Sequence, residues 1–323
     1  MGADTLEFEE PIAILLKELE ALDLLPRTAA RDREIETLRR RVESVRATLY
    51  RSLTAWQRVL VSRHPNRPGL EDYIKLLFTN FVEIHGDRRF ADDHALMTGF
   101  AQYHDQAVLL VGHVKGNDTK EKIFRNFGYA RPEGYRKALR AMRLAEKFSR
   151  PVIVFVDTPA AYPGIESEER GVAEAIAVNL RDMMVLDTPV IVIVTGEGGS
   201  GGALGIAIGD RILMQEFSIY SVIPPEGCAA ILWRDAARKV DAAEALKLTA
   251  PDLLKAGIID EIIAEPVGGA HTDPAAAGRL LDAALARVLG EVSALDSETR
   301  LARRYEKFRN MGRAGIDFVE ESS

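Results

Sequence analysis

Residues 190–209 read VIVIVTGEGGSGGALGIAIG, and this stretch decides the fold. Its first five residues, Val190 to Val194, are apolar, which is typical of a parallel strand buried on both faces. Six glycines follow within residues 196–205, and we expect a short apolar helix from Ala203 to Ile208. A strand that ends in glycines and opens into a helix leaves main-chain N–H groups free, and these favour an oxyanion or a phosphate. The stretch therefore predicts an anion site where a strand ends.

Strand-like and helix-like patterns alternate on both sides of this stretch. The expected strands are 97–103 and 107–114, joined by a hairpin turn, then 151–156, 211–214, 218–223 and 258–263. The expected helices are 132–148, 166–184, 226–233 and 242–255, with a last long helix from Pro274. We expect residues 115–128 to form a basic loop. This order predicts an α/β fold with parallel crossover connections.

The first 58 residues differ from the rest of the chain. Pro11 can start a helix with one apolar stripe, which Pro26 ends. A second helix places apolar residues from Ile35 to Leu49 at spacings of three and four. We expect the two helices to form an antiparallel hairpin that packs on the main body or on a second subunit.

The composition excludes several classes of protein. A net charge of −7 over 323 residues argues against nonspecific binding to nucleic acid or to an anionic membrane. The single cysteine, Cys228, excludes an internal disulfide and a cysteine-based zinc site, and the six histidines show no metal-binding spacing. We therefore predict no metal. The N-terminus lacks the pattern of a signal peptide, and no apolar run reaches the roughly 18 residues of a membrane span. A cytoplasmic location is expected.

The glycine run fits three other interpretations. It contains G-x-G-x-x-G, the dinucleotide fingerprint, with Glu216 as a candidate ribose acid, but the following helix is short for such a unit. It also contains G-x-S-x-G around Ser200, which in a serine hydrolase would need partners such as Asp260 and His271. Glycines required only for tight packing are the third alternative.

Three further segments are candidates for ligand contacts. Two loops follow strands, where ligands collect in parallel sheets. The first, residues 157–164, offers Tyr162 and Gly164, and the second, residues 224–228, offers Glu226 and Gly227. The third segment carries seven lysines and arginines within residues 115–137, among them Lys115, Lys120 and Arg125. Such a cluster is typical of a solvated face or of contacts to phosphate or carboxylate groups.

Several long motifs together resemble one known family. They are LEFEEPI (6–12), DDHALMTGFA (92–101), GNDTKEKIFRNFGYARPEGYRKALR (116–140), DTPAAYPG (157–164), GEGGSGGA (196–203) and PEGCAAILW (225–233). In this order they are similar to the alpha subunits of bacterial acetyl-coenzyme A carboxylase carboxyltransferase. The resemblance covers about Leu6 to Gly290. It implies a crotonase-like fold of repeated ββα units, with a helical extension over residues 1–31, a carboxyltransferase domain over 32–288 and a helical tail over 289–323.

The resemblance also implies a reaction and its partners. The family transfers a carboxyl group from carboxybiotin to acetyl-CoA, giving malonyl-CoA, the first committed step of fatty-acid synthesis. Its active site lies between alpha and beta subunits in an α2β2 assembly, and zinc is expected only on the beta subunit. The biotin is carried by a biotin carboxyl carrier protein, and a separate biotin carboxylase consumes the ATP. Neither biotin nor CoA would be bound covalently by this chain.

The resemblance assigns the glycine pair a role. Gly201 and Gly202 match the glycines whose main-chain N–H groups hold the ureido oxygen of biotin, and the freed biotin nitrogen is the plausible base. Two positions depart from the family, since Ala160 stands where glycine is usual and Pro224 where serine is frequent. We expect Ala160 to disturb its loop if that position requires a positive φ. A subunit of another biotin-dependent acyl-CoA carboxylase or decarboxylase, and a scaffold that only completes a partner's site, remain alternatives.

Overall fold

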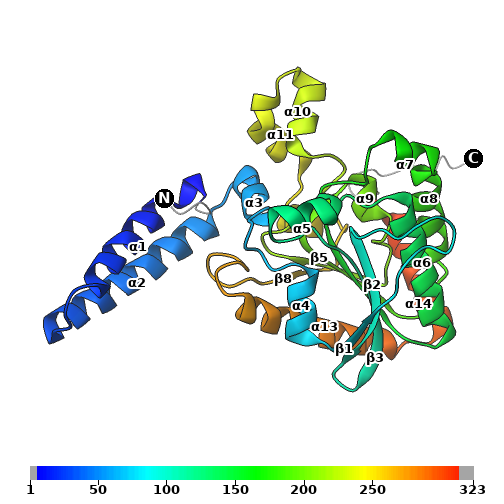
Figure 1. The fold of residues 1–323 in the computed structure, drawn as a ribbon, viewed down its shortest axis with the longest axis horizontal. Coiled ribbons are helices and arrows are strands. Elements are labelled where there is room, and N and C mark those ends of the chain that lie inside the picture. The colour runs from blue at the N-terminus through cyan, green and yellow to red at the C-terminus, as the bar shows by residue number, and fades with distance from the viewer. Residues whose placement is uncertain (1–5, 313–323) are drawn as a thin grey trace, which may run out of the picture.

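A single mixed sheet organises the protein, for which a computed structural model describes residues 6–312 (Figure 1). The strand order is β1-β2-β3-β4-β5-β6-β8, and β7 pairs with β5. The first three strands are antiparallel neighbours and all other pairs are parallel. The strands are β1 (Thr79–Glu83), β2 (Leu96–Tyr103), β3 (Gln106–His113), β4 (Val152–Thr158), β5 (Val190–Gly199), β6 (Arg211–Gln215), β7 (Ile219–Ser221) and β8 (Glu261–Ile263).

The two faces of the sheet have separate hydrophobic cores. Along β4, Val152, Val154 and Val156 face one core, while Ile153 and Phe155 face the other, as the period of two in a strand requires. The helices α6 (Pro132–Lys147) and α8 (Val172–Met183) cover the first face. The helices α4 (Leu70–Leu77) and α13 (Pro274–Ser293) cover the second. Both faces are buried, which explains the uninterrupted apolar runs of β4 and β5.

The glycine run does not leave the sheet where its sequence predicts. The expectation that the strand stops at Val194 is wrong, because β5 continues to Gly199, and the helix α9 spans Ser200–Leu204 instead of 203–208. Residues 191–194 of β5 pair with β6, and residues 197–199 pair with β7. Glycines permit this extension because neighbouring main chain comes close: a Cβ on Gly199 would lie 1.8 Å from the Pro159 oxygen.

Most other predicted elements are confirmed, and two predicted helices are broken at left-handed residues. The helix expected over 166–184 is broken at Gly171, whose φ is 76°, into α7 (Ile165–Glu169) and α8. The helix expected over 242–255 is broken at Lys247, φ 52°, into α11 (Lys239–Leu246) and α12 (Ala250–Lys255). The expected strands near 218–223 and 258–263 shorten to β7 and β8. The expected loop after β3 contains α5 (Thr119–Phe124), and α14 (Ser297–Asn310) follows α13.

The N-terminal hairpin is present as predicted and projects from the body (Figure 1). It consists of α1 (Glu10–Asp23) and α2 (Ala29–Arg51), followed by α3 (Ala55–Ser62). Its base is anchored where the Tyr50 ring meets Phe217 at 5.4 Å and the Tyr50 hydroxyl donates to Glu9 over 2.6 Å. The expected domain boundaries at 31 and 288 fall inside α2 and α13, and the division into domains stays a prediction. Within residues 6–312, no helix is both long and apolar enough to cross a membrane.

Candidate functional site

The candidate site lies where β3, β4 and β5 end at the same edge of the sheet. The register places Gly112 of β3 beside Phe155 of β4, and Thr158 of β4 beside Gly198 of β5. The helix α9 begins directly after β5, and the loop 159–161 lies against it. Parallel sheets bind ligands at this edge because the loops that follow the strands converge there.

Gly201 and Gly202 lie in the first turn of α9, with the left-handed residue Ser200 (φ 50°) before them. First-turn N–H groups have no intrahelical acceptor. No turn or loop hydrogen bond among the described residues uses the N–H of Gly201 or Gly202. Their carbonyls are occupied, since Gly201 accepts from the Gly205 N–H at 2.9 Å and Gly202 from the Tyr135 hydroxyl at 3.3 Å. Gly201 and Gly202 are therefore two adjacent candidate donors at the sheet edge.

Packing accounts for most glycines in the run. A Cβ would lie 2.3 Å from the Asp157 carboxylate at Gly196, and 2.3 Å from the Ala160 carbonyl carbon at Gly202. Gly198 and Gly205 are similarly crowded by the rings of Tyr220 and Tyr135. Gly201 differs, because its Cβ would meet only the Ile176 methyl at 3.5 Å, which is ordinary contact. The number of glycines is thus explained by tight packing, and an anion would be held by the first-turn N–H groups of α9.

A chain of ion pairs links the glycine run to neighbouring elements of the fold. The Lys115 ammonium lies 2.6 Å from Asp157 and 2.8 Å from Glu197, which belongs to the glycine run. The Arg63 guanidinium joins Glu197 to Glu226 at the start of α10 (Pro225–Trp233). A small cavity of about 130 Å³ opens beside Arg63, Lys115 and Asp157. The cluster connects three strand ends with α3 and α10, so it fixes the position of the glycine turn.

The ionised state of Glu197 is held by its partners. Burial raises the pKa of the carboxyl group, but the ion pairs with Lys115 and Arg63 outweigh burial, and the pKa lies below its ordinary value. For Lys115, burial lowers the pKa, but Asp157 and Glu197 raise it more. Both groups stay charged near neutral pH, and their charges compensate each other.

His113 ends β3 beneath the same turn and is 1% exposed. Neither ring nitrogen makes a hydrogen bond of standard geometry, and the main chain of Gly202 and Phe155 lies near enough to favour the protonated ring only weakly. Burial, with the nearby Lys115 charge, lowers the pKa of His113 to about 3. The ring is neutral at physiological pH and is unsuited to hold an anion.

The loop 157–164 places its candidate residues beside the turn. The Arg131 guanidinium lies 4.9 Å above the Tyr162 ring, and a Cβ on Gly164 would come within 2.4 Å of that ring. Ala160 does not have a positive φ, so the expected disturbance of its loop is absent. Gly202 packs on the main chain of Ala160 and Ala161, which brings this loop and the glycine pair together.

The basic candidates have different surroundings. Lys115 is engaged by two carboxylates, as described above. Arg125 donates to Glu71 at 2.7 Å and to the His94 carbonyl at 3.2 Å. Lys120 is exposed on α5. Of the three, Lys120 is the cation best exposed to an approaching ligand.

The second candidate loop forms the start of α10. Glu226 accepts from Arg63, and a Cβ on Gly227 would make only ordinary contact with Ile223 at 3.4 Å. Pro224 is the N-cap residue, where its missing N–H leaves no donor unsatisfied in the helix. Glu226 therefore has a partner, and its place in the ion-pair chain links α10 to the glycine turn.

The geometry is incompatible with the hydrolase interpretation. Asp260 accepts from the Ile212 N–H at the start of β6, at the opposite edge of the sheet from Ser200. His271 stacks on His64 with ring centroids 3.8 Å apart. The three side chains do not assemble, because Ser200 and Asp260 lie at opposite ends of parallel strands. The dinucleotide interpretation also fails, since the first glycines of its motif belong to β5 and Glu216 bonds to the Glu265 N–H.

Sequence reasoning missed the supporting residues of the site. The sequence does not mark Arg63 or Glu197 as candidate site residues, and Asp157 enters only as the first residue of the loop 157–164. A signal existed, because Glu197 is a charged residue within an apolar and glycine-rich strand. The described residues contain no group of three His, Cys, Asp or Glu side chains that could hold a metal ion.

Comparison with known proteins places the whole chain in one family. Residues 5–312 match a family described as acetyl co-enzyme A carboxylase carboxyltransferase-like. A Geobacter metallireducens protein is 54% identical over 309 residues, covering 95% of this chain and 97% of the relative. A Phenylobacterium zucineum protein is 51% identical, covering 98% and 100%. Both are named acetyl-coenzyme A carboxylase carboxyl transferase subunit alpha.

Solved structures support the fold. A transcarboxylase 12S chain aligns with a TM-score of 0.55 at 20% identity, covering 69% of this chain and 42% of its own. The beta subunit of Pseudomonas aeruginosa geranyl-CoA carboxylase aligns at 0.53 with 16% identity, covering 76% and 44%. At these identities the likeness concerns the fold alone, and it agrees with the predicted crotonase-like architecture.

Proposed function

Because the chain belongs to the acetyl-coenzyme A carboxylase carboxyltransferase alpha-subunit family, we propose that it transfers a carboxyl group from carboxybiotin to acetyl-CoA together with a beta subunit. The product is malonyl-CoA, the first committed intermediate of fatty-acid synthesis. The observation that carries the proposal is the match over nearly the whole chain, and the position of Gly201 and Gly202 in the first turn of the helix that follows β5 agrees with it.

The glycine turn acts on the biotin half of the reaction. The C–N bond between biotin and the carboxyl group breaks, and negative charge develops on the ureido oxygen. The N–H groups of Gly201 and Gly202 donate to this oxygen, and the Lys115–Glu197–Arg63 chain keeps the turn rigid. A C–C bond forms at the methyl carbon of acetyl-CoA, whose proton passes to the freed biotin nitrogen. No side-chain base of this chain is required.

Exposed apolar side chains around the site support a partner that covers it. Ile123, Phe124 and Phe127 of the α5 segment are 50–64% exposed. Ile231 and Leu232 of α10 are 71% and 64% exposed. The second group shares α10 with Glu226 of the ion-pair chain, and exposed apolar residues of this kind mark protein interfaces. We assign this surface to the beta subunit in an α2β2 assembly, which brings the enolate-stabilising groups and the zinc. The assembly also receives carboxybiotin from a carrier protein that a biotin carboxylase loads.

The decisive test is reconstitution with the candidate beta subunit. The purified pair is expected to carboxylate biotin from malonyl-CoA in the reverse reaction, whereas either chain alone is inactive. Acetyl-CoA is expected to be preferred over propionyl-CoA in the forward direction. Full transfer by the beta subunit alone would reduce this chain to a scaffold, and a preference for propionyl-CoA would assign it to another acyl-CoA carboxylase.

The role of the N–H groups can be isolated by replacing Gly201 with glycolic acid. This exchange substitutes an ester oxygen for one N–H and adds no side chain. The loss of one oxyanion donor is expected to lower kcat about 10²–10³-fold while assembly with the beta subunit is unchanged. The same replacement at Gly227 is the matched control. An unchanged kcat for the Gly201 ester would exclude this N–H from the oxyanion site.

A further inference from the structure

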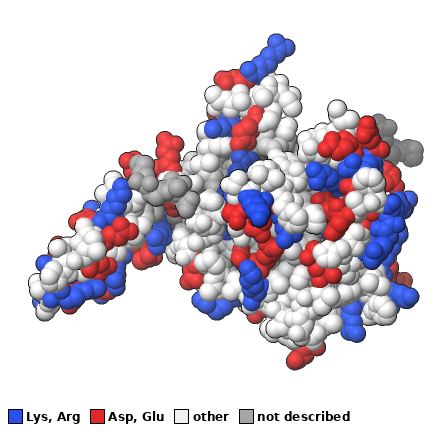
Figure 2. Space-filling model, viewed as in Figure 1, with Lys and Arg blue, Asp and Glu red and all other residues white. Residues whose placement is uncertain are grey.

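A groove of arginines lies between α6, α8 and the loop 84–95, and it has no part in the function proposed above. Its volume is about 430 Å³. Six arginines line it, against only two carboxylates, Asp87 and Glu174; the arginines are Arg88, Arg89, Arg136, Arg140, Arg143 and Arg181. Blue side chains gather on the right side of Figure 2, where Figure 1 places α6 and α8. The whole chain has a net charge of −7, so the groove opposes the average charge of the molecule.

Three of the six arginines have no carboxylate partner. Within residues 6–312, no Asp or Glu oxygen lies within 4 Å of the guanidinium groups of Arg88, Arg89 or Arg140. Arg140 instead donates to the main-chain carbonyls of His85 and Gly86 at 2.9–3.2 Å. These bonds orient the guanidinium without neutralising it. Positive charge therefore remains in the groove.

Most of the other charges in the groove are already paired, and Glu174 is the one lining carboxylate without an ion pair among the described residues. Asp87 accepts from the N–H groups of three following residues at 2.7–3.1 Å and from Arg136 at 2.8 Å. Arg143 and Arg181 share Asp182. Arg136, Arg140 and Arg143 also follow one face of α6, an arrangement of like charges that disfavours a helix. The protein keeps this arrangement although it is locally unfavourable, as expected for a surface that binds an anion.

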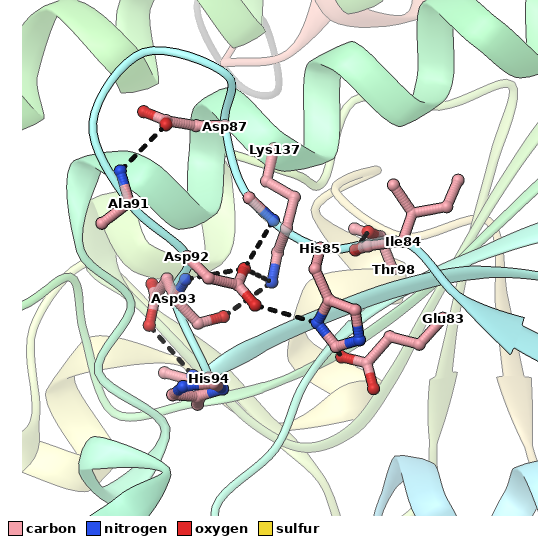
Figure 3. Close-up of polar contacts among 12 residues, drawn as sticks. Glu83, Ile84, His85, Asp87, Ala91, Asp92, Asp93, His94, Thr98 and Lys137 are labelled. Atoms are coloured by element: carbon pink, nitrogen blue, oxygen red, sulfur yellow. Dashed lines mark hydrogen bonds and ion pairs between the residues drawn. The ribbon is translucent and has the colours of Figure 1, made fainter.

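The loop that presents Arg88 and Arg89 is rigidly built (Figure 3). Asp92 accepts from the Gly86 and Asp93 N–H groups, each at 2.9 Å, and from the Lys137 ammonium at 2.6 Å. Lys137 is fully buried, and it ties the loop to α6. Arg88 adopts a left-handed φ of 63°, a conformation that a non-glycine residue holds only when its surroundings impose it. The main chain that carries Arg88 and Arg89 is thus fixed before a ligand arrives, while their exposed guanidinium groups stay free to reach it.

We propose that this groove binds a small organic molecule that carries two or more phosphate groups. Planar guanidinium groups match phosphate oxygens in pairs, and several unpaired guanidinium groups require more than one phosphate. The wall formed by Leu139, Ala175 and Val178 is apolar and suits the organic part. The volume is that of a small-molecule pocket. The site is separate from the glycine turn, because none of its lining residues belongs to residues 196–202 or to the ion-pair chain of Lys115, Glu197 and Arg63.

Calorimetric titration of the full chain at low ionic strength tests the proposal, with phosphate, pyrophosphate and ADP as probes. Pyrophosphate is expected to bind at one saturable site and at least about tenfold more tightly than phosphate, because it bridges two guanidinium groups. Tighter binding of ADP than of pyrophosphate would place the nucleoside on the apolar wall. No saturable binding of either compound, or equal binding of phosphate and pyrophosphate, would overturn the proposal.

Two variants locate the site. Arg88→Ala removes no intramolecular side-chain hydrogen bond within the described residues and is expected to weaken pyrophosphate binding about tenfold or more, with an unchanged thermal midpoint. Arg140→Lys keeps the positive charge but loses the planar guanidinium group that can pair with two phosphate oxygens. It is expected to lose less affinity for pyrophosphate than Arg88→Ala. Arg41→Ala, at an exposed arginine of α2, is the control and should not alter binding. Unchanged binding by Arg88→Ala, or displacement of ADP by single-stranded RNA at lower concentration, would contradict the assignment to a small polyphosphate.

Discussion

Gly201 and Gly202 are neighbours in the chain with different surroundings. Substitution by alanine is therefore expected to change the stability of the protein differently at the two positions. A Cβ at Gly202 would lie 2.3–2.4 Å from main-chain atoms of Ala160 and Ala161, which cannot move as a side chain can. Gly202→Ala is therefore expected to destabilise the protein by about 1–3 kcal/mol through overpacking. Gly201→Ala should leave the free energy of unfolding within about 1 kcal/mol of the wild type, because space is open there.

Urea denaturation of both glycine variants, followed by the carboxyl-transfer assay, separates packing from catalysis. Gly201→Ala is expected to lower kcat with little change in stability, since its methyl group lies beside a donor of the proposed oxyanion site. Equal stability of the two variants would contradict the close approach of residues 160–161 to the turn.

The buried ring of His113 makes the protein sensitive to acid. The unfolded chain binds a proton near pH 6.5, whereas the folded protein resists protonation until about pH 3. The unfolded state therefore holds more protons in this range, and stability falls as the pH is lowered from 6.5. His113→Phe should reduce the slope of unfolding free energy against pH by up to about 1.4 kcal/mol per pH unit. Parallel slopes for wild type and variant between pH 6 and 4.5 would contradict this origin.

The ion pairs of Glu197 make the stability of the protein depend on pH at more acidic values than His113 does. Because its folded pKa lies below the ordinary value of 4.5, Glu197 contributes stability above that value and loses it as the pH falls further. Glu197→Gln is expected to lower stability at pH 7 and to flatten the curve below pH 4.5. Its measured curve should meet that of the wild type at strongly acidic pH.

Candidate residues whose signal is local could be predicted from the sequence. The glycine run is continuous, so its position at a strand exit could be predicted. The surroundings of Lys115 could not, because its partners Asp157 and Glu197 end two other strands and meet it only when the sheet forms. A basic cluster in the chain was therefore a poor indication of free cations, and the groove around Arg140 combines residues from three separate segments.

Two helical glycines illustrate that helix propensity alone does not determine how a substitution by alanine changes the stability of the protein. Gly290 in α13 is exposed, and a Cβ there would meet nothing within 4 Å. Gly290→Ala is expected to stabilise the protein by about 0.5–1 kcal/mol. In α6, a Cβ at Gly134 would lie 2.3 Å from the Asp93 carboxylate and 3.2 Å from Leu96. Gly134→Ala should destabilise, and denaturation curves that rank the two variants in the opposite order would contradict the packing of Asp93.

The sequence predicts the elements with strong apolar periodicity well, but it does not predict the residues at which they end. The strands β4 and β5 and the helix α6 follow from uninterrupted or amphipathic apolar patterns. The strand β1 was missed because it is an edge strand with mostly exposed side chains. The helix α5 was missed because its sequence is largely charged, although Asp118 caps it by accepting from the Glu121 N–H at 2.8 Å. Breaks such as that at Lys247 depend on tertiary contacts and carry no local signal.

In the molecule as a whole, Arg67 joins segments that are far apart in the sequence. Its guanidinium donates to the Thr195 carbonyl at 2.6 Å and to both oxygens of Glu265 at 2.6 and 2.8 Å. The two side chains are 4% and 0% exposed. Arg67→Met would leave Glu265 buried without its cation, and a loss of about 3–5 kcal/mol in unfolding free energy is expected. A loss below about 1 kcal/mol in urea titrations with an unchanged m-value would show that water replaces the guanidinium.

An excess of arginine at one place on an acidic body gives the molecule a large electric dipole. The field of these arginines attracts a small anion that approaches from solvent, and the encounter is faster at low ionic strength. The protein is therefore expected to bind a cation-exchange matrix at pH 7, well above its isoelectric point of 5.6. The reason is that the matrix contacts one positively charged face of the protein, whose local charge differs from the net charge of the whole surface.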